Sequence, residues 1–223
     1  QSCHQTTGAA GAKPLANADK GTSSHNWNVP AVNGTMETEL PLNTQMSLRV
    51  PDGNIICSTC HNQHNNGNAG NPYLRADNTG DAMCKDCHRP RDRGLYADDN
   101  TNNKGTHPVG ISYEGGDSRF NSAPTTTQLV SGKVECSSCH GMHDVTGLLG
   151  LETNGNLLRT SIDVNLCTDC HAYSTHNGMD CLDCHQVHNT NKTNIYMIKN
   201  SIITPSSGTK TVVFSSQTGA NSF

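Results

Sequence analysis

Apolar residues are sparse along this chain, and the segment where they cluster most clearly lies near the C-terminal end. There, the apolar and β-branched runs 195–198, 202–203 and 211–214 flank the turn-forming run 205–208. Such runs on either side of a turn are typical of paired strands. We therefore predict a small β-hairpin or ribbon in residues 194–223, with an exposed edge available to a neighbouring chain.

Two long polar segments, residues 26–56 and 108–135, read as loops because prolines interrupt them. Their prolines are Pro30, Pro41, Pro51, Pro108 and Pro124. Leu, Ile, Val and Phe make up 36 of the 223 residues, about 16%, which is below the roughly 20% typical of folding chains. The net charge of −4 is too small for self-repulsion to explain this composition. Something other than side chains must therefore supply the core.

The pentapeptide Cys-x-x-Cys-His occurs five times, and it is the attachment signature of c-type haem. The two thiols add to the haem vinyl groups as thioethers, and the histidine becomes the proximal iron ligand. The cysteines of the complete motifs are Cys57, Cys60, Cys84, Cys87, Cys136, Cys139, Cys167, Cys170, Cys181 and Cys184. Cys3, followed by His4, has the form of the end of a sixth motif. Either the printed sequence starts one residue late, or this haem has a single thioether.

Two other uses of Cys-x-x-Cys pairs are zinc sites and disulfide frameworks. Neither explains why a histidine directly follows the second cysteine in every copy of the motif. Haem attachment explains both the cysteines and the histidine, and we prefer it.

The chain has twelve histidines, enough to give each of six irons two axial ligands. The histidines that directly follow a motif cysteine are expected as proximal ligands: His4, His61, His88, His140, His171 and His185. The others are expected as distal ligands: His25, His64, His107, His143, His176 and His188. The sequence thus predicts six haem c groups with bis-histidine ligation and low potentials. We expect the methionines near the motifs, Met83, Met142 and Met179, to pack against haem edges instead of binding iron.

Six haems also account for the missing core, because each is a large flat apolar body that side chains can enclose. Folding is then expected to depend on haem attachment, as small metal domains fold only with their metal. Ionised propionates would make the holoprotein acidic, which argues against nucleic-acid binding. Haem attachment of this kind occurs in an export compartment, so we expect a secreted or periplasmic protein in its mature form. No apolar run is long enough for membrane insertion.

The motifs and histidines recur in a fixed order, which divides the chain into three repeat units. Each unit has a first motif, a lone histidine, and a second motif with a further histidine three residues on. The units span about 1–66, 84–145 and 167–190, within one domain over residues 1–223 that ends in the ribbon at 194–223. The expected fold is mainly irregular coil templated by haem, with short α-helices at the motifs and the C-terminal hairpin.

The histidine three residues after each second motif lies nearly one helical turn from the motif histidine, so both imidazoles would share a face. They would then bind two neighbouring irons, because opposite sides of one iron are out of their reach. This arrangement would hold neighbouring haems close together.

The segment CSSCHGMHDVTGLLGLETNGNLLRTSIDVNLCTDCH resembles the doubled CxxCH arrangement of multihaem cytochromes. The flanking THPVG and NIYMIKNSIITPSSGTKTVVF are similar to segments of the same proteins. Six bis-histidine haems in a chain of this length resemble the extracellular cytochrome filaments, or nanowires, of metal-respiring microbes. The resemblance implies a continuous haem stack in a head-to-tail homopolymer, with a distal histidine donated to a haem of the next subunit. We expect His188 or His25 to cross the interface, since they lie nearest the ends of the repeat array.

The predicted function is electron transfer through six stacked haems, as the subunit of an extracellular filament that serves external metal acceptors or other redox proteins. A soluble periplasmic electron shuttle is the second hypothesis, and a multihaem reductase with one open haem is the third. If all twelve histidines bind iron, no haem is open to a substrate. We therefore predict an electron carrier that is not an enzyme, and assign no catalytic residues.

Overall fold

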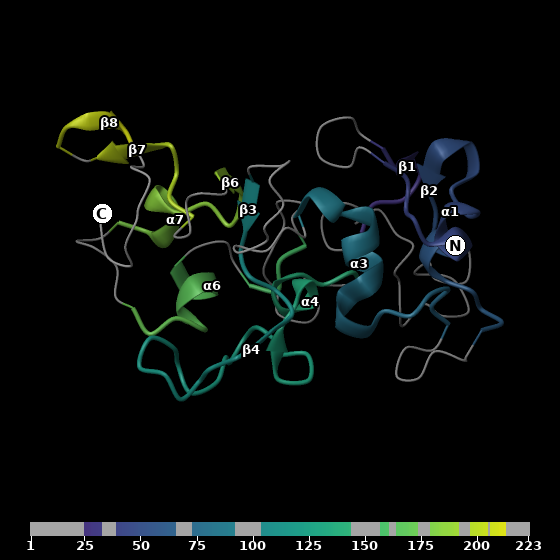
Figure 1. The fold of residues 1–223 in the computed structure, drawn as a ribbon, viewed down its shortest axis with the longest axis horizontal. Coiled ribbons are helices and arrows are strands. Elements are labelled where there is room, and N and C mark those ends of the chain that lie inside the picture. The colour runs from purple at the N-terminus through teal and green to yellow at the C-terminus, as the bar shows by residue number, and fades with distance from the viewer. Residues whose placement is uncertain are drawn as a thin grey trace, which may run out of the picture.

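The computed structural model describes residues 25–32, 39–65, 73–91, 104–143, 157–160, 164–173, 179–191, 197–204 and 206–212. Three of the expected haem-binding residues, Cys3, His4 and His176, lie outside these ranges. The described elements follow one another along the long axis of the molecule in approximately chain order (Figure 1). β1, β2 and α1 lie at one end, and α7, β7 and β8 lie at the other.

Every complete motif includes a short helix, and in four of the five motifs the helix ends at the second cysteine. The motif helices are α2 (Cys57–Cys60), α3 (Ala82–Cys87), α4 (Cys136–Cys139), α6 (Val164–Thr168) and α7 (Cys181–Cys184). A further helix, α1 (Thr44–Ser47), begins after Asn43, whose side chain accepts hydrogen bonds from the N–H groups of Gln45 and Met46. Single 3₁₀ turns lie at Pro51–Gly53, Thr79–Asp81 and Arg89–Arg91.

The described strands form four two-stranded antiparallel sheets. The pairs are β1 (Val29–Pro30) with β2 (Asn54–Ile55), β3 (Lys104–Thr106) with β6 (His188–Asn191), β4 (Ile111–Ser112) with β5 (Lys133–Val134), and β7 (Ser201–Thr204) with β8 (Gly208–Thr211). The β7–β8 hairpin lies within the segment predicted as a ribbon. The segments read as loops, 26–56 and 108–135, hold β1, α1, β2, β4 and β5. Strands of two residues are too short to produce a readable alternation, so the sequence did not indicate them.

The β1–β2 and β4–β5 pairs occupy equivalent places in the first and second repeat units. Each directly follows a residue with positive φ that lies three positions after a lone histidine: Asn28 (φ 55°) and Gly110 (φ 75°). Asn28 donates its N–H to the carbonyl of Ile55 at 2.7 Å, and Gly110 donates to Val134 at 2.8 Å. The chain thus takes the same path from the lone histidine to the second motif in both units.

Few apolar side chains are buried among the described residues. The buried ones are Trp27, Met46, Ala76, Met83, Leu157 and Leu158. One cluster joins Met46, Ala76 and Met83, and the motif cysteines Cys60 and Cys87 pack against it. Among the residues that the structure places, no helix combines the length and apolar character needed to cross a bilayer. The side chains surround the motif cysteines and form only a small core of their own.

Candidate haem sites

Eight histidines meet in four pairs, and each pair joins a motif histidine to one of the predicted distal ligands. The ring-centre distances are 6.2 Å for His88 with His25, 5.9 Å for His61 with His143, 6.1 Å for His171 with His107, and 6.3 Å for His140 with His188. In all four cases the partners come from different repeat units. The structure therefore brings proximal and distal candidates together without any local sequence relation between them.

The distance within each pair is the one that two imidazoles need to bind opposite sides of a single iron. A bond from a metal to an imidazole nitrogen is about 2 Å long, which puts the two ring centres about 6.3 Å apart. All four observed distances lie within a few tenths of an ångström of this value. The residues present therefore fit a bis-histidine haem at four of the motifs.

The lone histidines are also oriented as metal ligands should be. The Nδ1 atom of His25 is 2.8 Å from the carbonyl oxygen of Asn26, and that of His107 is 3.1 Å from the carbonyl oxygen of Pro108. A carbonyl can only accept, so in each ring Nδ1 carries the hydrogen and Nε2 keeps its lone pair. Backbone contacts of this kind select the tautomer and the ring orientation of metal-bound histidines.

Burial favours the neutral imidazole that iron binding requires. It lowers the pKa of His107, and burial followed by the neighbouring His107 and His185 lowers the pKa of His171. Burial, His140 and Arg91 together lower the pKa of His188 to about 4. These rings are therefore neutral near pH 7 and can each offer a nitrogen lone pair.

The structure bears on two expectations about the distal ligands. His25 and His188, proposed to cross a subunit interface, lie opposite motif histidines of their own chain. The histidine of each second motif also lies beyond the helix, in extended backbone, as at His61 (φ −110°, ψ 145°) and His140 (φ −107°, ψ 146°). Closure of the CxxC turn ends the helix at the second cysteine, so the imidazoles of His140 and His143 do not share a helical face.

The residue before the second cysteine stabilises each second motif through an equivalent hydrogen bond in all three units. Thr59 Oγ1 accepts the N–H of Ile56 at 3.0 Å, and Ser138 Oγ accepts the N–H of Glu135 at 2.9 Å. In the third unit a carboxylate takes this place, and Asp183 accepts the N–H of Asp180 at 2.8 Å. Each contact satisfies an N–H at the start of a four-residue helix that is too short to be stable alone.

In the first motifs of units two and three, an aspartate at the same position binds a distant loop. Asp86 accepts the N–H groups of Leu42 and Asn43 at 2.9 and 3.0 Å. The Asp169 carboxylate accepts N–H or O–H bonds of 2.7–3.2 Å from three consecutive threonines, Thr125, Thr126 and Thr127. Although burial acts to raise the pKa of Asp169, these hydrogen bonds hold it well below the usual value. Asp169 therefore attaches the 125–127 segment to the CTDCH motif.

Replacing Asp169 with alanine is expected to weaken the attachment of this segment by about 2–4 kcal/mol, because several donors lose a charged acceptor at once. Amide hydrogen exchange of the holoprotein should show opening at residues 125–127 increased by about 30- to 1000-fold. The matched control is Asp183→Ala, which removes only the local bond from Asp180 and should leave this exchange unchanged. Equal exchange in the Asp169→Ala and unmodified proteins would contradict the assignment.

A basic side chain binds a backbone carbonyl of every second motif, a contact that the sequence pattern did not predict. Arg75 donates through Nε to the carbonyl of Ser58 at 2.7 Å, Arg159 donates through Nε to that of Ser137 at 2.7 Å, and Lys199 donates through Nζ to that of Leu182. Each basic residue also donates its backbone N–H, at 2.8 Å, to the carbonyl oxygen of the second cysteine of that motif. The signal was present in the sequence as Tyr73-Leu74-Arg75, Leu157-Leu158-Arg159 and Met197-Ile198-Lys199, each of which begins at a positive φ.

The complete motifs lie next to one another in the order of the chain. Burial and the nearby thiols of Cys136 and Cys60 contribute to raising the pKa of Cys84 to about 12. Burial and the nearby Cys170 thiol contribute to raising the pKa of Cys139 to about 11. The motifs CSTCH, CKDCH, CSSCH and CTDCH are therefore close neighbours in space. The thiols within the described residues form no disulfide.

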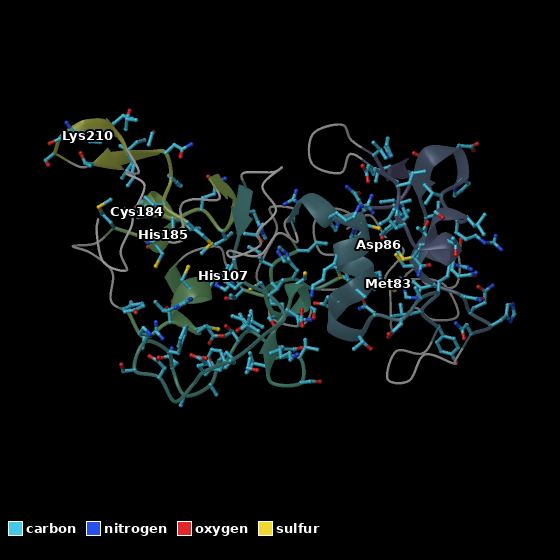
Figure 2. The ribbon with its side chains drawn as sticks, in the orientation of Figure 1. Met83, Asp86, His107, Cys184, His185 and Lys210 are labelled. Atoms are coloured by element: carbon cyan, nitrogen blue, oxygen red, sulfur yellow. The ribbon has the colours of Figure 1, made fainter. Side chains whose placement is uncertain are left out.

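Two further interactions link neighbouring motifs. His185 acts on the pKa of His171, which places the CLDCH motif beside CTDCH. Lys85 donates to the buried Glu135 carboxylate at 2.9 Å, and this ion pair links the CKDCH helix α3 to the start of the CSSCH helix α4. Figure 2 shows His107 near the middle of the molecule, with Cys184 and His185 toward the end that carries β7 and β8.

The methionines near the motifs differ in burial. Met83 is buried in the apolar cluster beside α1, whereas Met142 is exposed. No group of three or more His, Cys, Asp or Glu side chains within the described ranges is arranged to hold a metal ion directly. Eight of the ten histidines in these ranges lie instead in the four pairs.

The angles between the paired rings divide the four sites into two classes. The rings are near parallel at the second motifs, with angles of 30° for His61–His143 and 26° for His140–His188. At the first motifs the corresponding angles are 56° for the His88 pair and 76° for the His171 pair.

We therefore expect two low-spin ferric signals in the electron paramagnetic resonance spectrum of the oxidised holoprotein. Near-parallel ligand planes give a rhombic spectrum, because they lift the degeneracy of the iron d orbitals along one direction. Strongly tilted planes leave these orbitals nearly degenerate and give a broad signal with one large g value. A spectrum with a single class of low-spin haem would contradict these ring orientations.

A comparison with protein families supports the haem interpretation. A family model described as a doubled CXXCH motif matches residues 50–93, which include the CSTCH and CKDCH motifs. The matched segment runs from the second motif of the first repeat unit into the first motif of the second. No curated protein and no solved structure matches the chain.

The match indicates a multihaem c-type cytochrome. Its CXXCH motifs indicate covalently bound haem c, and electron transfer is the function that such a protein serves.

Proposed function

We propose that the protein carries electrons along six closely spaced c-type haems, each with two histidine ligands, as the subunit of an extracellular conductive filament. The haems are assigned to the five complete motifs and to the Cys3-His4 site. Each haem, when bound, supplies a one-electron couple whose potential depends on its axial ligands and surroundings. The filament would deliver electrons to external metal acceptors or to other redox proteins.

The observation that carries the proposal is the set of four histidine pairs at 5.9–6.3 Å, on motifs that lie side by side. With haem bound at these four sites, the paired imidazoles would occupy both axial positions of the iron, and a substrate would have no open position there. Adjacent bis-histidine sites with buried ligands suit electron transfer and disfavour catalysis. This arrangement supports a carrier over a reductase.

The work of the chain itself is to hold these sites at fixed spacing. The basic residues Arg75, Arg159 and Lys199 fasten the segment after each second motif to the motif carbonyls. Asp86 and Asp169 fasten the preceding loops to the first motifs. Burial keeps the imidazoles of His107, His171 and His188 neutral. Backbone carbonyls orient the lone His25 and His107.

The proposal is tested by measuring haem content and spin state, and by imaging the holoprotein. We expect six haems per chain, purely low-spin spectra, no carbon monoxide binding by the reduced protein, and filaments in cryo-electron micrographs. Compact monomers at high concentration would instead establish the periplasmic shuttle. A high-spin haem that binds carbon monoxide in the unmodified protein would revive the reductase.

A further inference from the structure

A positive charge lies against the backbone of the CSTCH motif. The half-buried Arg75 donates through Nε to the carbonyl of Ser58 at 2.7 Å, and through Nη2 to the carbonyl of the proximal His61 at 2.9 Å. Its backbone N–H also donates to the carbonyl of Cys60 at 2.8 Å. These acceptors are uncharged, and no carboxylate within the described residues forms an ion pair with Arg75. The guanidinium therefore adds a net positive charge beside this haem site.

The CTDCH motif has a charge of the opposite sign. Asp169 directly precedes Cys170, and its carboxylate accepts hydrogen bonds from the hydroxyl and N–H groups of residues 125–127. All of these donors are uncharged. The hydroxyl of Thr127 also lies 3.7 Å from the sulfur of Cys170. An aspartate is ionised at neutral pH, so Asp169 adds a net negative charge beside this second site.

At the CKDCH motif, by contrast, charges of opposite sign offset each other. Lys85 within the motif donates to the carboxylate of Glu135 at 2.9 Å. Asp86, the next residue of the motif, lies 3.4 Å from the guanidinium of Arg89. Each charged side chain of this motif thus has a partner of the opposite charge, and the net effect on its haem is small.

The CSSCH motif is also balanced, although by charges from two different sources. Arg159 donates to the carbonyl of Ser137 at 2.7 Å, as Arg75 does at CSTCH. Burial and neighbouring thiols raise the pKa of Cys139, while Arg159 acts to lower it and Asp169 to raise it further. Both charges therefore reach this site and oppose each other there.

We propose that Arg75 and Asp169 set the two ends of the range of haem potentials among the four sites with paired histidines. Arg75 makes the haem at CSTCH the easiest to reduce, and Asp169 makes the haem at CTDCH the hardest. Reduction adds one electron to a ferric iron and removes its net positive charge. A nearby cation therefore favours the ferrous state, and a nearby carboxylate favours the ferric state. This inference rests on the proposed haem electron carrier but not on the filament.

The two charges give electron transfer within the chain a direction. A unit charge at a distance of about 10 Å, with an effective dielectric constant of about 20, changes a one-electron equilibrium by about tenfold. Two charges of opposite sign then favour the ferrous state at CSTCH over CTDCH by about a hundredfold. A ferrous haem at CTDCH gives up one electron and becomes ferric, and a ferric haem at CSTCH accepts one and becomes ferrous. The balanced CSSCH and CKDCH motifs lie between the two in the row.

The test follows the electron paramagnetic resonance spectrum of the holoprotein during stepwise reduction at controlled potential. The CSTCH pair, with rings at 30°, contributes to the rhombic class, and the CTDCH pair, at 76°, contributes to the class with one large g value. Arg75→Gln keeps an amide donor but removes the charge. It should lower the midpoint of one rhombic component by about 59 mV, which is a tenfold change in the ratio of reduced to oxidised haem. Asp169→Asn should raise the midpoint of one large-g component by a similar amount.

Two control variants separate the effect of charge from other effects. Arg75→Lys keeps the charge, and Lys199 shows that a lysine at the equivalent place can donate to a motif carbonyl. This variant should keep the midpoints of the unmodified protein. Glu114→Gln removes an exposed carboxylate that water and salt screen, and should also leave every midpoint unchanged.

An unchanged midpoint in folded, low-spin Arg75→Gln or Asp169→Asn protein would overturn the inference, and the electron carrier would stand. Equal shifts in Arg75→Gln and Arg75→Lys would also overturn it, because the lost hydrogen bonds and not the charge would then set the potential. The two sites are tested independently, so failure of one variant to fold still leaves the other to decide. Absence of low-spin haem from the unmodified protein would instead refute the proposed function itself.

Discussion

Chain produced without haem attachment is expected to be unfolded. The described residues bury few apolar side chains, and the main cluster of three, Met46, Ala76 and Met83, packs against the haem-binding Cys60 and Cys87. The helices at the motifs have four to six residues, and several strands have two, so none is stable without tertiary support. Conformational entropy opposes ordering of every residue, and this small core cannot offset it.

The measurement compares holoprotein with reduced apoprotein made in a compartment that lacks haem attachment. Far-ultraviolet circular dichroism and amide proton dispersion of the apoprotein should be those of an unstructured chain, without a cooperative thermal transition. The holoprotein at the same concentration should show dispersed amide signals and resist unfolding. A cooperative transition in the apoprotein would show that side chains alone specify the fold, contrary to what the sparse core indicates.

The sequence allowed the ligand residues to be nominated because haem attachment is a local signature. All residues that attach the haem and bind its iron on the proximal side lie within the five residues of the Cys-x-x-Cys-His motif, so the motif can be recognised without knowing the fold. Which histidine pairs with which could not be predicted, because paired residues such as His61 and His143 belong to different units and come close only when the chain folds.

The parts of the fold that the sequence did not reveal are contacts between single residues and backbone carbonyls. Arg159 and Lys199 each follow an apolar residue at a position that no periodicity marks, and only comparison between units shows their common role. The turn before β5 could have been predicted, since Ser131 (φ 52°) and Gly132 (φ 74°) form a two-residue hairpin turn of a common type. Its two-residue strand is too short to be read from alternation.

Replacing His143 with alanine is expected to convert one haem per chain from low spin to high spin. His143 lies 5.9 Å from His61 between ring centres, so its loss would leave the CSTCH iron with the proximal ligand alone. The reduced variant should then bind carbon monoxide at that single site. His143→Met should restore low spin but raise the potential of this haem, by a fraction of the ~0.8 V range that axial ligands span.

The matched control is Met142→Ala, because Met142 adjoins His143, is exposed, and contributes only its backbone carbonyl to the contact with His25. This variant should keep every haem low-spin, bind no carbon monoxide and show unaltered potentials. Since the pairs at His88, His140 and His171 share no ligand with the CSTCH site, their spectra should also persist in the His143→Ala protein. A fully low-spin His143→Ala protein would exclude His143 as the distal ligand of the CSTCH iron.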